Sequence, residues 1–200
     1  MELKACCKER FEPVVQAIRK LQKEKEGLDE PLIVAIDGRC GSGKTTLGEY
    51  LEQVFDCNLF RMDDFFLRME QRTPQRLKET GGNVDYERVE AEVLQPAKRG
   101  MTVSYRRFDC SRMELTEVRT FQPQGILLVE GAYSCHPKLR DYFDLRIFVS
   151  IDPEMQMQRI LLRNGSERAE MFRNRWIPLE ENYIAQCQVE EVCDLHLGAD

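Results

Sequence analysis

The 200-residue sequence predicts one α/β domain, in which about five parallel strands form a sheet with helices on both faces. Short apolar runs rich in β-branched residues alternate along the chain with longer segments whose apolar residues recur at helical spacing. The first apolar run stops abruptly at a glycine-rich segment, as is typical of a strand buried on both faces. The hydrophobic content of 42% is enough for a sizeable core and excludes a wholly disordered chain.

The N-terminal segment predicts an amphipathic helix that packs on the main body. Its apolar residues recur at helical spacing between charged ones: Phe11, Val14, Val15, Ile18 and Leu21. Pro13 suits an early helical position and Gly27 a helix end. We therefore divide the chain into this helix, residues 1–28, and a main domain over residues 29–200.

Four apolar runs predict the buried strands: Leu32–Ile36, Asn58–Met62, Ile126–Val129 and Leu145–Val149. The segments that separate and follow them predict helices: Thr45–Val54, Tyr86–Arg99, Pro137–Phe143, Pro153–Leu162 and Leu179–Glu191. Because strands and helices alternate, the strands should pair in parallel. We expect a small hairpin within residues 101–121, and a last short run, Val192–Leu197, closes the chain.

Charge and cysteine content exclude several classes of protein. The net charge of -6 argues against a general nucleic-acid binder, and no apolar run reaches the roughly 20 residues of a membrane span. The charged start of the chain is unlike a signal peptide, so we expect a cytoplasmic protein whose eight cysteines are reduced. The absence of C-x-x-C and the presence of only two histidines argue against a structural zinc site.

Residues 38–45, GRCGSGKT, match the phosphate-binding pattern G-x-x-x-x-G-K-[ST] between a predicted strand and a predicted helix. Glycines let backbone N–H groups approach phosphate oxygens, and the following helix begins with unpaired N–H groups and a partial positive charge. Lys44 can reach the β/γ-phosphates, and the Thr45 hydroxyl suits a Mg²⁺ shell. We predict ATP and Mg²⁺ as cofactors, with the ATP phosphates bound by Gly38, Arg39, Cys40, Gly41, Ser42, Gly43, Lys44, Thr45 and Thr46.

Carboxylates follow two of the predicted strands. Glu130 ends the strand Ile126–Val129, where it could orient Mg²⁺ together with Thr45 or accept a proton; the alternative is a cap for the next segment. Asp63 and Asp64 follow the second strand. Asp63 is the candidate base for an acceptor hydroxyl, and the alternative for the pair is a turn with a helix cap. Ligands of open parallel sheets bind at the carboxyl ends of the strands, so we expect both sites beside the phosphate loop.

Arginines crowd one late stretch of the chain: Arg159, Arg163, Arg168, Arg173 and Arg175. We interpret the region around residues 163–175 as a lid that excludes water and neutralises developing charge, with Arg163 as the first catalytic candidate. The alternative is an ordinary solvated helix face. The chain has no Thr/Asn-Lys-x-Asp run of the kind that reads guanine, so a small-molecule kinase is favoured over a GTPase.

With these motifs the chain resembles, from about Leu32 to its end, the uridine kinase-like group of P-loop kinases. That group also includes nicotinamide riboside kinase, phosphoribulokinase and the bacterial pantothenate kinase. The resemblance covers the phosphate loop, Asp63–Phe66, Gly82–Tyr86, Val103–Arg112, Val129–Gly131, Asp144–Val149 and Arg159–Arg163. It implies a P-loop kinase fold and transfer of the ATP γ-phosphoryl group to a hydroxyl of a nucleoside-like metabolite.

The resemblance also implies roles for acceptor-side residues. It makes Asp63 the base, directs Asp85 to ribose hydroxyls, places the Tyr105 ring near a nucleobase and assigns Arg112 to the substrate. Cys110, however, stands where uridine kinases carry a base-reading histidine, and a thiol is a poor hydrogen-bond partner for a pyrimidine edge.

Two neighbouring arginines, Arg106 and Arg107, would suit an anionic or differently shaped acceptor. Pantothenate, a sugar phosphate and nicotinamide riboside therefore stay open as acceptors, as does a nucleotide-binding regulatory ATPase. Trp176 is expected to pack under the lid. We expect a small-molecule acceptor as partner, without nucleic acid or membrane, and the sequence is compatible with a homo-oligomer.

Overall fold

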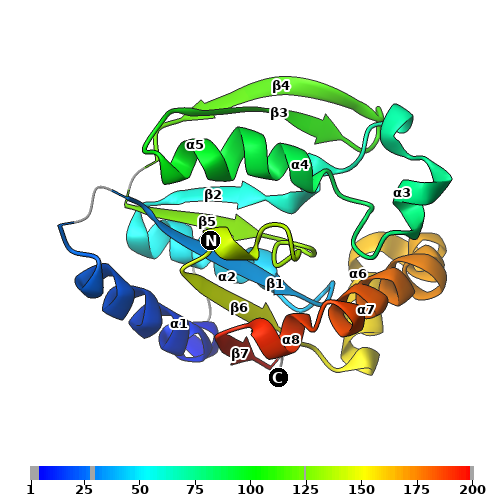
Figure 1. The fold of residues 1–200 in the computed structure, drawn as a ribbon. Helices are drawn as coiled ribbons and strands as arrows, with labels where there is room; N and C mark the ends of the chain where they lie inside the picture. The colour runs from blue at the N-terminus through cyan, green and yellow to red at the C-terminus, as the bar shows by residue number, and fades with distance from the viewer. Residues whose placement is uncertain (1–4, 28–29, 124, 199–200) are drawn as a thin grey trace.

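The structure is a computed structural model that describes residues 5–27, 30–123 and 125–198. Its centre is a five-stranded parallel sheet in the order β2-β5-β1-β6-β7 (Figure 1). The strands are β1 (Leu32–Gly38), β2 (Asn58–Arg61), β5 (Ile126–Glu130), β6 (Leu145–Val149) and β7 (Leu195–Leu197). The predicted fold class is confirmed: the four apolar runs form strands, and the last short run supplies the fifth.

Helices cover both faces of this sheet, and each face has its own core. Every residue of β1 is buried because this strand lies in the middle of the sheet between the two cores. Leu32, Val34 and Ile36 pack with α1 (Ala5–Glu24) and α2 (Lys44–Phe55). Ile33 and Ala35 face the other way, toward the helical segments that follow residue 85 and precede the C-terminus.

The N-terminal helix contributes directly to one core. Phe11, Val14, Val15 and Ile18 of α1 are buried among strand residues, so the helix packs on the sheet. Residues 1–4 and 28 of the first predicted unit lie outside the described residues. Pro13 is inside α1 and not at its start, because the helix already begins at Ala5.

The remaining helices follow the prediction with local differences, except α3 (Pro74–Lys78), which lies outside the predicted helices. They are α3, α4 (Tyr86–Arg88), a π-helical segment Val89–Leu94, α5 (Gln95–Lys98), α6 (Pro153–Met171), a π-helical turn Phe172–Trp176, α7 (Ile177–Gln186) and α8 (Val189–Val192). The predicted helix Leu179–Glu191 is divided because Gln188 has a left-handed backbone between α7 and α8.

The helix predicted over Pro137–Phe143 is wrong. Only one 3-10 turn, Arg140–Tyr142, forms there. The backbone makes successive short turns, with His136 N–H donating to the Tyr133 carbonyl and Leu139 N–H to the His136 carbonyl. These hydrogen bonds span three residues, not the four of an α-helix.

A two-stranded antiparallel hairpin, β3 (Val103–Asp109) and β4 (Glu114–Phe121), fills the region where a small hairpin was predicted. Val103, Tyr105 and Phe108 of β3 are buried, whereas the residues between them face outward. The hairpin lies beyond α4 and α5 on one side of the molecule (Figure 1). Its turn points toward the carboxyl end of the sheet and delivers Cys110 and Met113 to the cavity described below.

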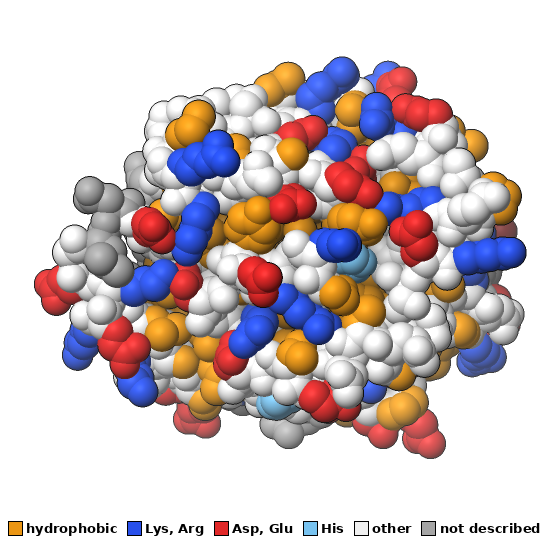
Figure 2. Space-filling view, viewed as in Figure 1, with side chains coloured by type: hydrophobic (Ala, Val, Ile, Leu, Met, Phe, Trp, Pro, Cys, Tyr) orange, Lys and Arg blue, Asp and Glu red, His pale blue; other side chains and the backbone are white. Residues whose placement is uncertain are grey.

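Over the described residues, the surface carries charges of both signs and the cysteines form no disulfide bond. Figure 2 shows Lys and Arg interspersed with Asp and Glu on the viewed face. The six cysteines whose side chains the structure describes are free thiols. Among the described residues, no helix combines the length and apolar character required to cross a bilayer.

His136 makes stability depend on pH. It is 6% exposed and stacks on Tyr86 with ring centroids 4.2 Å apart. Burial lowers its pKa to about 4, from an ordinary value of about 6.5. The unfolded state therefore binds more protons between these two values, so this contribution to stability is complete above pH 6.5 and is lost as pH falls toward 4.

Between pH 6.5 and 4 the unfolding free energy should fall less in His136→Gln than in the wild type, by about 3 kcal/mol. Denaturant titrations at several pH values measure it. Equal slopes for His136→Gln and wild type would contradict the prediction.

Candidate active site

The phosphate loop leaves the carboxyl end of the central strand and enters α2. Gly38 has φ 133°, and a Cβ added there would lie 2.1 Å from the Val149 carbonyl oxygen of β6. Gly43, with φ 100°, turns the chain directly into α2. Only glycine suits the first position, because the neighbouring backbone leaves no room and the conformation is unfavourable for L-residues.

Lys44 folds back over this loop. Its Nζ donates to the Gly38 carbonyl at 2.6 Å and to the Arg39 carbonyl at 2.9 Å. Ser42 Oγ is buried without a hydrogen-bond partner in the described structure. A lysine, an unpartnered hydroxyl and a helix start thus converge on one concave loop, a combination that fits the phosphates of a nucleotide.

Thr45 and Glu130 lie side by side. Thr45 Oγ1 donates to Glu130 Oε1 at 3.2 Å, and Glu130 is only 5% exposed. Burial raises the pKa of Glu130, Lys44 opposes the rise and Asp63 adds to it. Among the described residues no group of three or more His, Cys, Asp and Glu side chains forms a metal site. The hydroxyl and carboxylate fit Mg²⁺, which usually keeps waters and phosphate oxygens among its ligands.

A cavity of about 680 Å³ joins these groups to the acceptor side. The predicted phosphate contacts that line it are Cys40, Gly41, Gly43, Lys44, Thr45 and Thr46, whereas Gly38, Arg39 and Ser42 do not. Asp63 and Glu130 line it too, as does Arg163 of α6. Residues that follow β1 and β2 thus meet the end of β5 and residues of α6 at the carboxyl end of the sheet, as expected for open α/β folds.

The two aspartates after β2 have separate environments. Asp63 lies in the 3-10 turn Met62–Phe65 and opens into the cavity. Burial raises the pKa of Asp63, and the charge of Asp64 raises it further. Lys44 and Arg163 lower it. Asp64 is buried and accepts hydrogen bonds from Tyr105 Oη at 3.1 Å, Arg107 Nε at 3.1 Å and Arg119 Nη1 at 3.2 Å. Asp64 therefore ties the hairpin to the sheet, and Asp63 remains available to a ligand.

Three expected acceptor contacts are not brought to this cavity. Tyr105 is 4% exposed and packs between Phe60 and Phe65, because β3 turns this side of the strand inward. Asp85 is buried, caps α4 by accepting from Arg88 N–H, and accepts from Gln71 Nε2 at 2.8 Å.

Arg112 is exposed on the hairpin turn and pairs with Glu114 at 3.0 Å. None of the three lines the cavity, and each already has partners within the protein.

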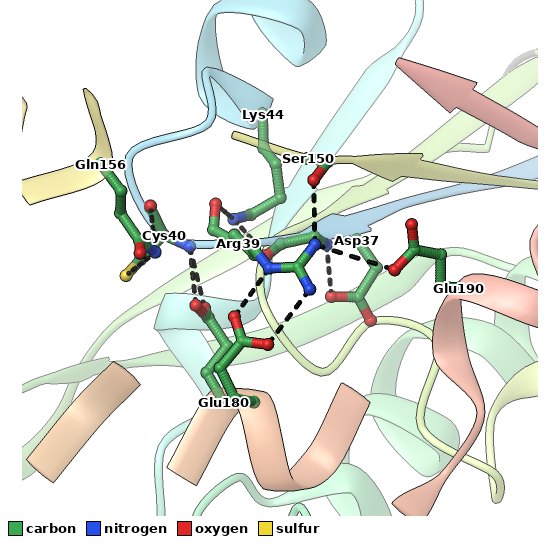
Figure 3. Close-up of polar contacts among 10 residues, drawn as sticks. Asp37, Arg39, Cys40, Lys44, Ser150, Gln156, Glu180 and Glu190 are labelled. Carbon is green, nitrogen blue, oxygen red and sulfur yellow. Dashed lines mark hydrogen bonds and ion pairs between the residues drawn. The ribbon is translucent and has the colours of Figure 1, made fainter. Parts of the chain in front are cut away.

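A layer of acids that the sequence did not predict lies behind the phosphate loop (Figure 3). Glu180 of α7 is 4% exposed, and its two oxygens accept from Cys40 N–H at 2.8 and 3.0 Å. The Arg39 guanidinium points toward α7, where it pairs with Glu181 at 2.7 Å. The side chain of Arg39 thus joins the loop to the last helices, in contrast to its predicted phosphate contact.

Asp37, the residue before the loop, was also missed. Its buried carboxylate accepts from Gly38 N–H at 2.7 Å, Cys135 N–H at 2.8 Å, Tyr133 N–H at 3.2 Å and Tyr183 Oη at 2.8 Å. The sequence signal that could have identified Asp37 is an aspartate near the end of an otherwise apolar strand. Because burial of a carboxylate is costly, its several donors are needed to keep it there.

The predicted lid, residues 163–175, is helical. Gly165 (φ 78°) interrupts α6, and the chain continues through the π-helical turn Phe172–Trp176 into α7. Arg159 Nη1 donates to the Gly41 carbonyl at 3.2 Å, and Arg163 lines the cavity. Trp176 also lines it, so this side chain is a wall of the cavity and not a packing anchor alone.

Comparisons with known proteins agree with this geometry. The model of the phosphoribulokinase/uridine kinase family matches residues 33–174. Uridine kinase from Chlamydia pneumoniae is 27% identical over 172 residues, which cover 76% of each chain.

Two solved structures share the fold. A possible uridine kinase from Bacillus stearothermophilus has a TM-score of 0.63 at 20% identity, over 92% of this chain and 99% of that chain. D-glycerate 3-kinase from Cryptococcus neoformans has a TM-score of 0.65 at 20% identity, over 98% of this chain and 94% of that chain. The chain therefore belongs to the phosphoribulokinase/uridine kinase family of P-loop kinases.

Proposed function

We propose that this protein transfers the γ-phosphoryl group of ATP to a hydroxyl of a small metabolite. One observation carries the proposal: the phosphate loop with Lys44 and the carboxylate of Asp63 line the same cavity. A nucleotide phosphate and an alcohol can therefore meet there, which is the central requirement of a kinase. The family supports a nucleoside-like acceptor, but Tyr105 and Asp85 are engaged elsewhere, so the proposal rests on the hydroxyl and not on a nucleobase.

The phosphate side of the cavity would hold Mg-ATP. Lys44 and the loop amides would bind the phosphates, and Thr45 and Glu130 would hold Mg²⁺. When bound, ATP supplies the phosphoryl group and Mg²⁺ neutralises charge on its phosphates. Cys40 N–H is occupied by Glu180, so a ligand that uses this amide must displace that carboxylate.

The acceptor side has one group suited to proton transfer. Asp63 opens into the cavity, and its raised pKa makes it a stronger base than an ordinary aspartate. Lys44 and Arg163 favour its ionised form, so it can accept the hydroxyl proton as the bond to phosphorus forms. Arg163, which lines the cavity, would stabilise negative charge between donor and acceptor, and Phe172 and Trp176 would supply apolar surface that limits water.

We expect ADP release to depend on an added acceptor and to fall about 10²–10⁴-fold in Asp63→Asn, which removes the base. A coupled assay with nucleosides, nicotinamide riboside, pantothenate and sugar phosphates measures it, with Lys44→Ala as the inactive reference. Asp56→Asn is the matched control, because Asp56 is exposed and its left-handed backbone tolerates asparagine. ADP release that no acceptor stimulates would refute the kinase function.

The rate should also depend on pH. Asp63 must be ionised to accept a proton, so kcat/KM should fall as pH decreases through its raised pKa, above the ordinary aspartate value of about 3.9. The acidic limb reports Asp63 and Glu130 together, because the two carboxyls interact. Arg163→Gln removes a charge that lowers this pKa, so the limb should move to higher pH. A limb unchanged in Arg163→Gln would contradict this arrangement.

A further inference from the structure

We propose that the phosphoryl acceptor carries an oxyanion, a carboxylate or a phosphate, in addition to its reacting hydroxyl, and that Arg72 binds this oxyanion. The inference rests on the proposed kinase function and names the chemical class of its acceptor. It makes Arg72 a specificity-determining residue at the acceptor side of the cavity.

The other arginines from β2 through α4, and those on the hairpin, already have partners. Arg106 donates to the Leu115 and Thr116 carbonyls, and Arg107 pairs with Asp64 at 3.1 Å. The same holds for Arg61 with Glu49, Arg68 with Glu70, Arg76 with Glu87, Arg88 with Glu92 and Arg119 with Asp64. Arg106 and Arg107, which the sequence associated with an anionic acceptor, are therefore used to hold the hairpin.

Arg72 differs from all of these. Its Nε donates to the Leu67 carbonyl at 3.0 Å, which fixes the side chain, and no carboxylate of the described residues lies within 4.0 Å of it. The nearby acids are occupied, because Glu70 pairs with Arg68 at 3.3 Å and Glu79 with Arg76 at 3.4 Å. The guanidinium thus keeps its terminal N–H groups for a ligand, and such a fork binds carboxylate or phosphate oxygens well.

The position of Arg72 fits an acceptor that reaches from Asp63 to the Arg72 guanidinium. Arg72 lines the main cavity together with Asp63, and it also lines a second hollow of about 440 Å³. The two hollows share Phe66, Arg72, Asn83 and Trp176. Both charges act on the Cys110 thiol. Burial raises its pKa most, Asp63 raises it further and Arg72 lowers it. The groups that would face the two ends of a small acceptor therefore lie around one thiol.

The positions of the other cations indicate that Arg72 binds the acceptor and not the nucleotide. Lys44 lies on the phosphate loop and Arg159 donates to the Gly41 carbonyl, so these cations belong to the phosphate side. Arg163 lines the cavity and lowers the pKa of Asp63, so its charge acts at the base. A neutral acceptor that covered Arg72 would remove a charge from water without giving it a partner, which is unfavourable.

Matched pairs of alcohols that differ in one anionic group test this inference. The pairs are D-glycerate and glycerol, pantothenate and pantothenol, and ribulose 5-phosphate and ribulose, each assayed for kcat/KM by ADP release with the full chain. We expect turnover of at least one charged member, with its neutral partner at least about 10-fold poorer. The carboxylate and phosphate pairs distinguish the two kinds of oxyanion.

Arg72→Gln should lower kcat/KM for the charged acceptor about 10- to 100-fold, mainly through KM, and leave that of the neutral partner unchanged. The KM for ATP should stay constant, which separates this role from a structural defect. Arg99→Gln is the matched control, because Arg99 is exposed at the end of α5 and does not line the cavity.

Two outcomes would overturn the inference and leave the kinase function intact. One is equal turnover of charged and neutral acceptors, and the other is a nucleoside without an anionic group as the best acceptor. A third outcome, equal loss of activity on both members of a pair in Arg72→Gln, would assign Arg72 a structural role. ADP release that no acceptor stimulates would instead refute the proposed function and this inference together.

Discussion

The buried carboxylate of Asp37 is the interaction on which the arrangement of the site depends. It is the penultimate residue of the central strand and accepts hydrogen bonds from Gly38, from two amides after β5 and from Tyr183 of α7. One side chain thus fixes three segments that are distant in sequence. Burial raises its pKa, and the hydrogen bonds from Cys135, Gly38 and Tyr183 oppose that rise. A carboxylate in such a place is stable only while its donors surround it, so the loop and its neighbours are held in one geometry.

Carboxylates near the phosphate loop take different roles because their surroundings differ. Asp64 is surrounded by donors and supports the hairpin, whereas Asp63, the next residue along the chain, faces the cavity. Glu130 contacts Thr45, and Glu180 holds the amide of Cys40. The raised pKa values of Asp63, Glu130 and Glu180 share burial as their leading cause, and Lys44 opposes each of them. Lys44 is therefore the charge that allows several acids to remain close together in one cavity.

The acceptor side shows how local pairing defines specificity. Most arginines around the hairpin pair with acids or donate to carbonyls of the chain itself, which fixes the shape of the hairpin. The hairpin turn brings a thiol to the cavity, and the segment after β2 brings Arg72. The wall opposite the phosphate loop is thus built from elements outside the central sheet. Acceptors within one kinase fold can change through such elements without any change in the loop that binds phosphate.

Contiguous features could be predicted from the sequence. The apolar run of β1, the glycines that follow it and the start of α2 lie within one short stretch, so residue spacing alone specified the strand, the loop and Lys44. The same holds for Glu130 at the end of β5 and Asp63 after β2, since parallel strands deliver their carboxyl ends to one edge. What only the tertiary structure decided depends on contacts between distant segments. Asp64 draws the Tyr105 hydroxyl inward from 41 residues away, and Glu180 reaches Cys40 across 140 residues. Arg72 faces the cavity unpaired because the neighbouring acids bind other arginines, and no local pattern in the chain records which partner each charge will choose.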